Sequence, residues 1–199
     1  MKNLKIVMLL ALMIPILFIG CKKDSTPTPT SLELTLTDNL GNPISGASVK
    51  LYSSQTDWSN GTNQVGTTQF SGALGKVDFN NLSNIKYYWF AEMDCKNNVN
   101  GAITSTLALT SNVNNPFNVI LSSTGTLTFV NTSSNPYQIY INGTASYTLN
   151  GGTTLNVNYM PIGSYSLRVV QLSGYAISPT DKTYTGTLNC GSSLTTTFP

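Results

Sequence analysis

Few side chains in this sequence could do acid–base or nucleophilic chemistry. The chain has no histidine, which removes Ser-His-Asp and Cys-His arrangements and nearly all catalytic zinc sites. Glu92 and Asp94 end a predicted strand at a spacing that puts both carboxylates on one face, about 7 Å apart, as a glycosidase pair can be. A catalytic pair normally comes from two strands that line a cleft. We therefore interpret Glu92 and Asp94 as a solvated strand end and predict no catalytic residues.

The first of the three cysteines follows a segment with the layout of a secretory signal. An apolar run over residues 6–20 begins after Lys2 and Lys5 and ends in a small residue just before Cys21. A basic start, an apolar core and a small residue at the cut are typical of such signals. The run is shorter than the roughly 20 apolar residues that a spanning helix needs. We predict a signal peptide over residues 1–20.

The motif around Cys21 indicates what happens to this cysteine. Residues 18–21, Phe-Ile-Gly-Cys, resemble a bacterial lipobox. The resemblance implies that Cys21 becomes the new N-terminus and is lipidated, and more than one lipid chain anchors a protein stably without spanning the membrane. The next residues, Lys-Lys-Asp at 22–24, resemble the start of many Bacteroidota lipoproteins. This resemblance implies anchoring in the outer membrane with export to the cell surface, and the alternative is the periplasmic face.

A linker separates the lipidated cysteine from the first predicted strand. Residues 21–31 form this segment, in which threonine and proline alternate. Such a sequence favours an extended, unpaired backbone of about 3 Å per residue, enough to hold a folded part roughly 30 Å from the lipid. Asp24-Ser25-Thr26 also matches a short O-glycosylation motif of the same phylum, so Ser25 is a candidate glycosylation site.

The other two cysteines, Cys95 and Cys190, form an even pair once Cys21 is lipidated. An exported protein meets an oxidising compartment, where such a pair can form one disulfide. The alternative is two buried free thiols. A Cys95–Cys190 disulfide would link the two halves of the chain, because the residues lie far apart in sequence.

Charge and turn composition exclude several kinds of partner. Loss of Lys2 and Lys5 with the signal lowers the 10 basic residues to eight, equal to the 8 acidic ones. A neutral chain argues against nucleic acid and against electrostatic binding to anionic lipid. The polar turn that begins at Asp38 does not have calcium-loop spacing, because Pro43 follows where further ligands are needed. We predict no metal and no cofactor.

From Leu32 onward the pattern predicts strand after strand. Residues 32–37, 47–51 and 77–79 alternate with period two, and no segment has a sustained helical period. Residues 122–125, Ser-Ser-Thr-Gly, interrupt the pattern and suggest a domain boundary. The other predicted strands are residues 85–91, 104–109, 117–121, 126–130, 136–141, 147–149, 154–159, 164–172, 183–188 and 193–198. The prediction is an all-β protein of two tandem small β-sandwiches, over residues 32–121 and 122–199.

Two motifs resemble known β domains. Residues 38–52, together with residues 75–82 and Tyr87-Tyr88, resemble the carboxypeptidase regulatory-like domains, which have a transthyretin-like or Cna-B-like sandwich. The resemblance covers most of residues 32–121 and implies a structural or interaction module without catalytic residues. Within it we expect the Gly-Asn-Pro turn at 41–43 to close a hairpin. Residues 160–167 resemble the Pro-x-Gly-x-Tyr turn of PEGA-like domains of Bacteroidota lipoproteins.

One aromatic residue stands out as a candidate for ligand binding. Trp58 follows Asp57 in a predicted loop, where an exposed ring could stack on a sugar. The alternative is that Trp58 caps one end of the first sandwich. Taken together, the sequence predicts a lipid-anchored, non-catalytic envelope protein that acts as a structural or binding module for an envelope protein or a glycan. The second hypothesis is a carbohydrate-binding surface lipoprotein, and the third is an unrecognised hydrolase.

Overall fold

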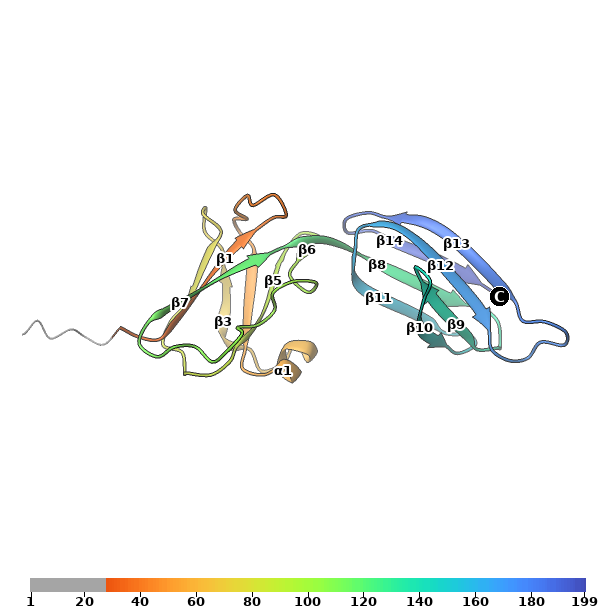
Figure 1. Ribbon diagram of the computed structural model, residues 1–199, viewed down its shortest axis with the longest axis horizontal. Coiled ribbons are helices and arrows are strands. Elements are labelled where there is room, and N and C mark those ends of the chain that lie inside the picture. Colours follow the sequence, from red (N-terminus) through yellow and green to blue (C-terminus); the bar gives the residue numbers. More distant parts are fainter. Residues whose placement is uncertain (1–27) are drawn as a thin grey trace, which may run out of the picture.

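The computed structural model describes residues 28–199, and its regular secondary structure is all β apart from one short helix, which confirms the predicted all-β fold of two tandem sandwiches (Figure 1). The predicted signal peptide, the lipidation site Cys21 and the candidate glycosylation site Ser25 lie outside the described residues. Between residues 28 and 199 no helix is both long enough and apolar enough to cross a membrane.

The first sandwich contains two sheets and one short helix. Its elements are β1 Ser31–Thr37, β2 Ser48–Tyr52, α1 Gln55–Asn60, β3 Val65–Phe70, β4 Lys76–Phe79, β5 Tyr88–Met93, β6 Lys96–Asn97 and β7 Asn114–Ile120. One sheet has the order β4-β1-β7, and the facing sheet contains β3-β2-β5-β6. Strand β1 is antiparallel to β4 but parallel to β7.

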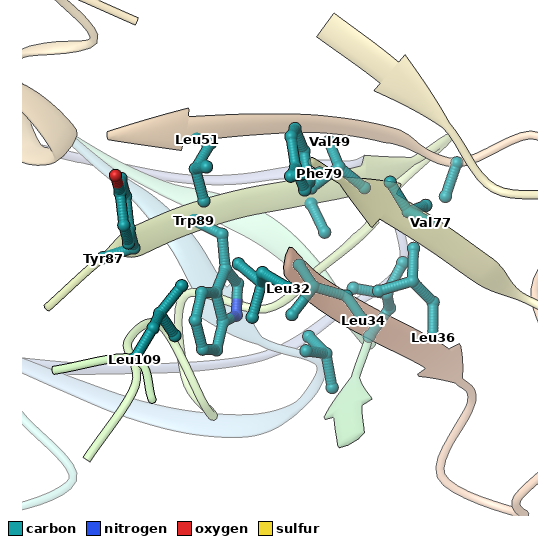
Figure 2. Packing of buried hydrophobic residues seen from close by; sticks show 14 residues of the cluster. Leu32, Leu34, Leu36, Val49, Leu51, Val77, Phe79, Tyr87, Trp89 and Leu109 are labelled. Carbon is teal, nitrogen blue, oxygen red and sulfur yellow. The ribbon is translucent and has the colours of Figure 1, made fainter. Parts of the chain in front are cut away.

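The period-two pattern of the sequence produces the core between these two sheets. Leu32, Leu34 and Leu36 of β1 are fully buried, and they face Val49 and Leu51 of β2. Figure 2 shows these side chains converging between the sheets, with the Trp89 indole among them. The other buried members of this core cluster are Ala47, Val77, Phe79, Tyr87, Trp89, Ala91, Leu109, Val119 and Leu121.

The second sandwich repeats the arrangement with its own core. Its strands are β8 Ser122–Asn131, β9 Tyr137–Ile141, β10 Thr144–Leu149, β11 Thr154–Pro161, β12 Gly163–Gln171, β13 Asp181–Leu188 and β14 Ser193–Phe198. One sheet has the order β10-β9-β12-β13, and in the facing sheet β8 pairs with both β11 and β14. The rings of Tyr137 and Phe198 lie 5.0 Å apart, centroid to centroid, within this second core.

Besides the two-residue strand β6, which has no sequence signal, three elements differ from the sequence-based expectation. Residues 104–109 are not a strand: only Thr104 forms an isolated bridge, and Leu107 is 77 % exposed. Strand β3 was not predicted, because its polar sequence lacks alternation and Phe70 at its end is 67 % exposed. The helix α1 is one and a half turns long, too short to produce a helical period in the sequence.

Two other predicted features lie at junctions of the fold. The Gly-Asn-Pro turn at 41–43 closes a short antiparallel hairpin against the end of β1, where Thr37 and Pro43 form a bridge and the Ile44 N–H donates to the Leu36 carbonyl (3.0 Å), and the chain then crosses to the other sheet. The predicted domain boundary at residues 122–125 is the first part of β8, where the chain passes from one sandwich to the other. The glycine there is not a turn residue: a Cβ on Gly125 would lie 2.7 Å from the Ser192 carbonyl oxygen, so close backbone packing requires it.

Strand β8 joins the two sandwiches end to end (Figure 1). Its first residues, Ser122 and Ser123, pair with β6 of the first sandwich, and the remainder pairs with β11 and β14 of the second. Thr124 lies at the crossing point. Its backbone N–H donates to the Cys95 carbonyl (2.9 Å), and its carbonyl accepts from the Gly191 N–H (2.9 Å).

A disulfide closes this joint. In the structure Cys95 and Cys190 are bonded, with their Cα atoms 5.5 Å apart, within the usual range for a disulfide. Beside it, the Asn97 side-chain amide donates to the Thr124 hydroxyl (2.8 Å), and both side chains are buried. The joint is therefore held by strand pairing, by hydrogen bonds and by one covalent crosslink.

Removing the crosslink should weaken the fold. For a Cys95→Ser/Cys190→Ser variant we expect the free energy of unfolding to fall by about 2–5 kcal/mol, because the bond constrains a long segment of the unfolded chain. Urea unfolding followed by circular dichroism measures this change. A non-reducing peptide map of the unaltered protein should contain the linked pair, and thiols that can be alkylated in the native protein would contradict the crosslink.

Adding one methyl group at the joint should also be destabilising. Gly125→Ala is expected to lower the free energy of unfolding by about 1–3 kcal/mol, because the new Cβ would overlap backbone atoms. Gly101→Ala is the matched control, since its Cβ would have no neighbour closer than 3.7 Å. Equal losses of stability in the two variants, measured by urea unfolding, would show that the close packing at Gly125 is unimportant.

Candidate binding groove

The predicted acidic pair does not form a catalytic arrangement. Glu92 lies at the end of β5, and Asp94 is an exposed turn residue with a φ of 54° between β5 and β6. Both line a small cleft of about 270 Å³ beside the disulfide. Over residues 28–199 no three His, Cys, Asp or Glu side chains are grouped so that they could hold a metal ion.

Helix α1 is built by a local capping arrangement around Asp57. Ser54 is the N-cap, and its hydroxyl accepts the backbone N–H of Asp57 (3.0 Å) while donating to the Asp57 carboxylate (2.6 Å). The carboxylate also accepts from the Asn63 side-chain amide (2.7 Å). These hydrogen bonds, the one from Ser54 most of all, hold the pKa of Asp57 below its ordinary value. The helix ends at Gly61, whose φ of 65° is the left-handed conformation that glycine favours.

This helix fixes the orientation of Trp58. The indole N–H donates to the backbone carbonyl of Trp89 in β5 (3.0 Å), and the ring is half-buried. One side of Trp58 therefore covers part of the outer face of the sheet. The other side of Trp58 lines a groove of about 450 Å³.

The floor of the groove is the outer face of the β2–β5 pair. Along β2 the residues alternate, with Val49 and Leu51 in the core and Lys50 on the opposite face. Lys50 lies directly across from Phe90 in the antiparallel register of β2 and β5, and both line the groove. Tyr52, two residues after Lys50, lies on the same face and continues the floor.

The opposite wall comes from the second sandwich. Tyr159 lies where the β11–β8 register shifts, and its φ of 59° is unusual for a residue other than glycine. The bulge turns its ring toward the first sandwich, where the Tyr159 and Phe90 centroids are 5.8 Å apart. The Asn100 side-chain amide donates to the Tyr159 carbonyl (2.8 Å) and holds this backbone in place. The groove thus needs both sandwiches.

One buried polar group opens into the groove. Tyr52 is only 3 % exposed, and its hydroxyl makes no hydrogen bond to any residue between 28 and 199. No fully buried side-chain oxygen or nitrogen in that part of the chain lacks a partner, so solvent must reach this hydroxyl. Burial, and to a smaller extent the charge of Glu92, raises the pKa of Tyr52 above its ordinary value. The hydroxyl therefore stays protonated and can donate a hydrogen bond.

Sequence reasoning found Trp58 but missed Tyr52, Phe90 and Tyr159. Period two on β2 already places Tyr52 on the face opposite the core, and the Ser54-x-x-Asp57 spacing is a helix N-terminus signal that predicts α1. Tyr159 had no such signal, because its position depends on the joint between the sandwiches.

Comparison with known proteins finds only distant structural likenesses. No protein-family model matches the chain, and no curated protein sequence matches it significantly. Solved structures that align with it include a streptococcal ancillary pilin (14 % identity, 87 % of this chain and 63 % of that one, TM-score 0.40). Others are the minor pilin GBS52 of Streptococcus agalactiae (15 %, 84 % and 94 %, TM-score 0.33) and the shaft pilin SpaA of Lactobacillus rhamnosus GG (10 %, 85 % and 98 %, TM-score 0.34).

These likenesses are distant, and the chain spans less than two thirds of the streptococcal ancillary pilin. At such identities and TM-scores they establish no family for the chain and identify no ligand.

Acid should loosen the helix that presents Trp58. Because the pKa of Asp57 is lowered in the folded protein, the stabilisation of α1 is present above the ordinary value of 3.8 and is lost as the pH falls through the lowered pKa. We expect Trp58 fluorescence to be constant above pH 3.8 and to shift to longer wavelength below it.

Three variants test the assignment to Asp57. Asp57→Asn should have the shifted emission already at neutral pH. Asp181→Asn, which removes an exposed acid of the second sandwich, should behave like the unaltered protein. Trp58→Phe isolates the emission of the buried Trp89, and a pH-dependent shift that persists in this variant would contradict the assignment.

Proposed function

We propose that the chain is a lipid-anchored, non-catalytic protein of a bacterial cell envelope, in which two β-sandwiches act as one crosslinked module that presents binding surfaces away from the membrane. The lipobox resemblance at Cys21 supports the anchor. The resemblance of residues 32–121 to carboxypeptidase regulatory-like domains supports a structural or interaction role. The observation that supports the proposal most strongly is the direction in which the chain passes through the two sandwiches.

Strand direction gives the order of the parts from the membrane outward. Strand β7 runs toward the second sandwich, because it leads directly into β8. Strand β1 is parallel to β7, pairing from Ser31 with Asn114 to Thr37 with Ile120. The chain therefore enters the first sandwich at the end farthest from the second (Figure 1). An anchor on Cys21 would hold the first sandwich near the membrane and the second one farther out.

The joint would keep the second sandwich farther from the membrane than the first, because it is not a flexible connection. The two sandwiches share β8, are crosslinked between Cys95 and Cys190, and exchange hydrogen bonds at Thr124. The module would thus act as a stiff spacer, which follows the linker that the sequence predicts over residues 21–31. We place it in the outer membrane, exposed at the cell surface, and the alternative is the periplasmic face.

Replacing the proposed lipidation site should release the protein from the membrane. In cells that process lipoproteins, the unaltered chain is expected in the detergent-rich phase after phase partitioning and Cys21→Ser in the aqueous phase, because more than one lipid chain is needed for stable anchoring. The Cys95→Ser/Cys190→Ser variant is the control and should partition like the unaltered chain.

One outcome counts against the anchor, and a second experiment decides between the two faces of the membrane. Retention of Cys21→Ser in the detergent-rich phase would remove the anchor. Protease treatment of intact cells separates the two faces of the membrane: digestion of the unaltered protein supports surface exposure, and protection that ends only when the cells are opened supports the periplasmic face.

A further inference from the structure

We propose that the groove between Trp58 and Tyr159 is a carbohydrate-binding site for a segment of one or two sugar units. This inference goes beyond the proposed function, because sugar binding requires neither the lipid nor a particular face of the membrane. It depends on the joint, however, because one wall of the groove belongs to the second sandwich.

The aromatic side chains that line the groove suit the binding of a pyranose ring. Trp58, Phe90 and Tyr159 line it together with Tyr52, so aromatic surfaces come from helix α1, from the sheet and from the second sandwich. A pyranose has faces of C–H groups that stack on aromatic rings and an edge of hydroxyl groups. The volume of about 450 Å³ lies within the range of small-molecule sites.

The polar groups of the groove suit hydroxyl ligands. Tyr52 is only 3 % exposed, its hydroxyl makes no hydrogen bond to a described residue, and its raised pKa keeps the hydroxyl protonated and able to donate. Ser59 and Asn60 line the same groove from α1 and offer further donors and acceptors. Lys50 is the one charged residue among the described residues that line it. A groove with aromatic rings, neutral polar groups and a single cation favours a neutral or weakly acidic sugar over a strongly charged ligand.

A peptide fits this position less well. Extended peptides usually bind by adding a strand to a free sheet edge, where unpaired backbone groups are available. The floor of the groove is formed by β2 and β5, and β2 is hydrogen-bonded on both sides, to β3 and to β5. Its backbone groups are therefore already paired, and only side chains are available to a ligand.

The backbone at Tyr159 is consistent with a binding role. A positive φ at a tyrosine costs free energy, and such conformations cluster at functional sites. The ring is 43 % exposed although it also contacts Phe90, so packing between the sandwiches leaves much of its surface free. The bulge holds an aromatic ring at the groove instead of burying it in the joint.

Titration of the full chain with disaccharides tests the proposal. The protein is purified in a detergent without a sugar headgroup and titrated with maltose, cellobiose, mannobiose, chitobiose and lactose, with Trp58 fluorescence and calorimetry as readouts. At least one disaccharide should bind with a dissociation constant below about 10 mM. A glycan array with the same protein then extends the search to longer sugars.

Variants locate the binding in the groove. Trp58→Ala and Tyr159→Ala should each weaken binding about tenfold or more by removing an aromatic surface. Tyr52→Phe should weaken it about three- to tenfold by removing one hydrogen bond. Tyr175→Ala, which removes a similarly exposed ring in the loop between β12 and β13, is the matched control and should bind like the unaltered protein. Tyr159 and Tyr52 lie outside α1, so these variants test the site even if Trp58→Ala unfolds the helix.

Three results would overturn the proposal. They are no binding of any tested sugar by array or titration, sugar binding that all three groove variants leave unchanged, and groove-dependent binding of an apolar peptide without sugar binding. The outcome is separable from the anchor, because Cys21→Ser should bind sugar as the unaltered chain does. Failure of sugar binding with normal lipid anchoring, or the reverse, shows which of the two proposals is wrong.

Discussion

The backbone pairing of β8 at Thr124 is the constraint on which the rest of the molecule depends. The strand leaves the first sandwich and enters the second without an intervening loop, and its Thr124 backbone is hydrogen-bonded to Cys95 on one side and Gly191 on the other. Gly125 allows the 188–192 segment to approach closely. Because the joint fixes the two sandwiches against each other, a disulfide can span it, and an aromatic residue of the second can complete a groove on the first.

The pair of strands β2 and β5 serves the core with one face and the groove with the other. The inner face of β2 and β5 supplies Val49, Leu51 and Trp89 to the core, whereas the outer face supplies Lys50 and Phe90 to the groove. Trp58 belongs to the outer side, where its indole N–H donates to the Trp89 carbonyl of β5 and its ring lines the groove. Stability of the first sandwich and the shape of the groove are therefore linked through the same strands.

Much of this architecture could be predicted from local patterns. Alternation at Leu32, Leu34 and Leu36 identified β1 because one face of that strand is fully buried. Prediction failed where a different constraint decided the structure. Residues 104–109 make a single bridge, from Thr104 to Tyr88 at the start of β5, and the N–H groups of Ser105 and Leu109 donate to the irregular backbone at Tyr87 and Ile85, so no strand ladder forms. The residues around Gly125 indicate a domain boundary, but the close tertiary packing that requires glycine there has no signal in the sequence. The groove escaped prediction because Tyr159 and Trp58, 101 positions apart in the sequence, meet only through the joint.

The parallel pairing of β1 and β7 has a mechanical consequence. If the chain is held at its N-terminal end and pulled through the second sandwich, force enters β1 at Ser31 and leaves β7 at Ile120, at opposite ends of the paired strands. The two strands are then loaded along their length, so that their backbone hydrogen bonds resist together instead of opening one after another. The disulfide lies beyond this pair, at the joint, and carries tension between the sandwiches covalently. A ligand bound in the groove would therefore be attached to a module that resists unfolding under tension.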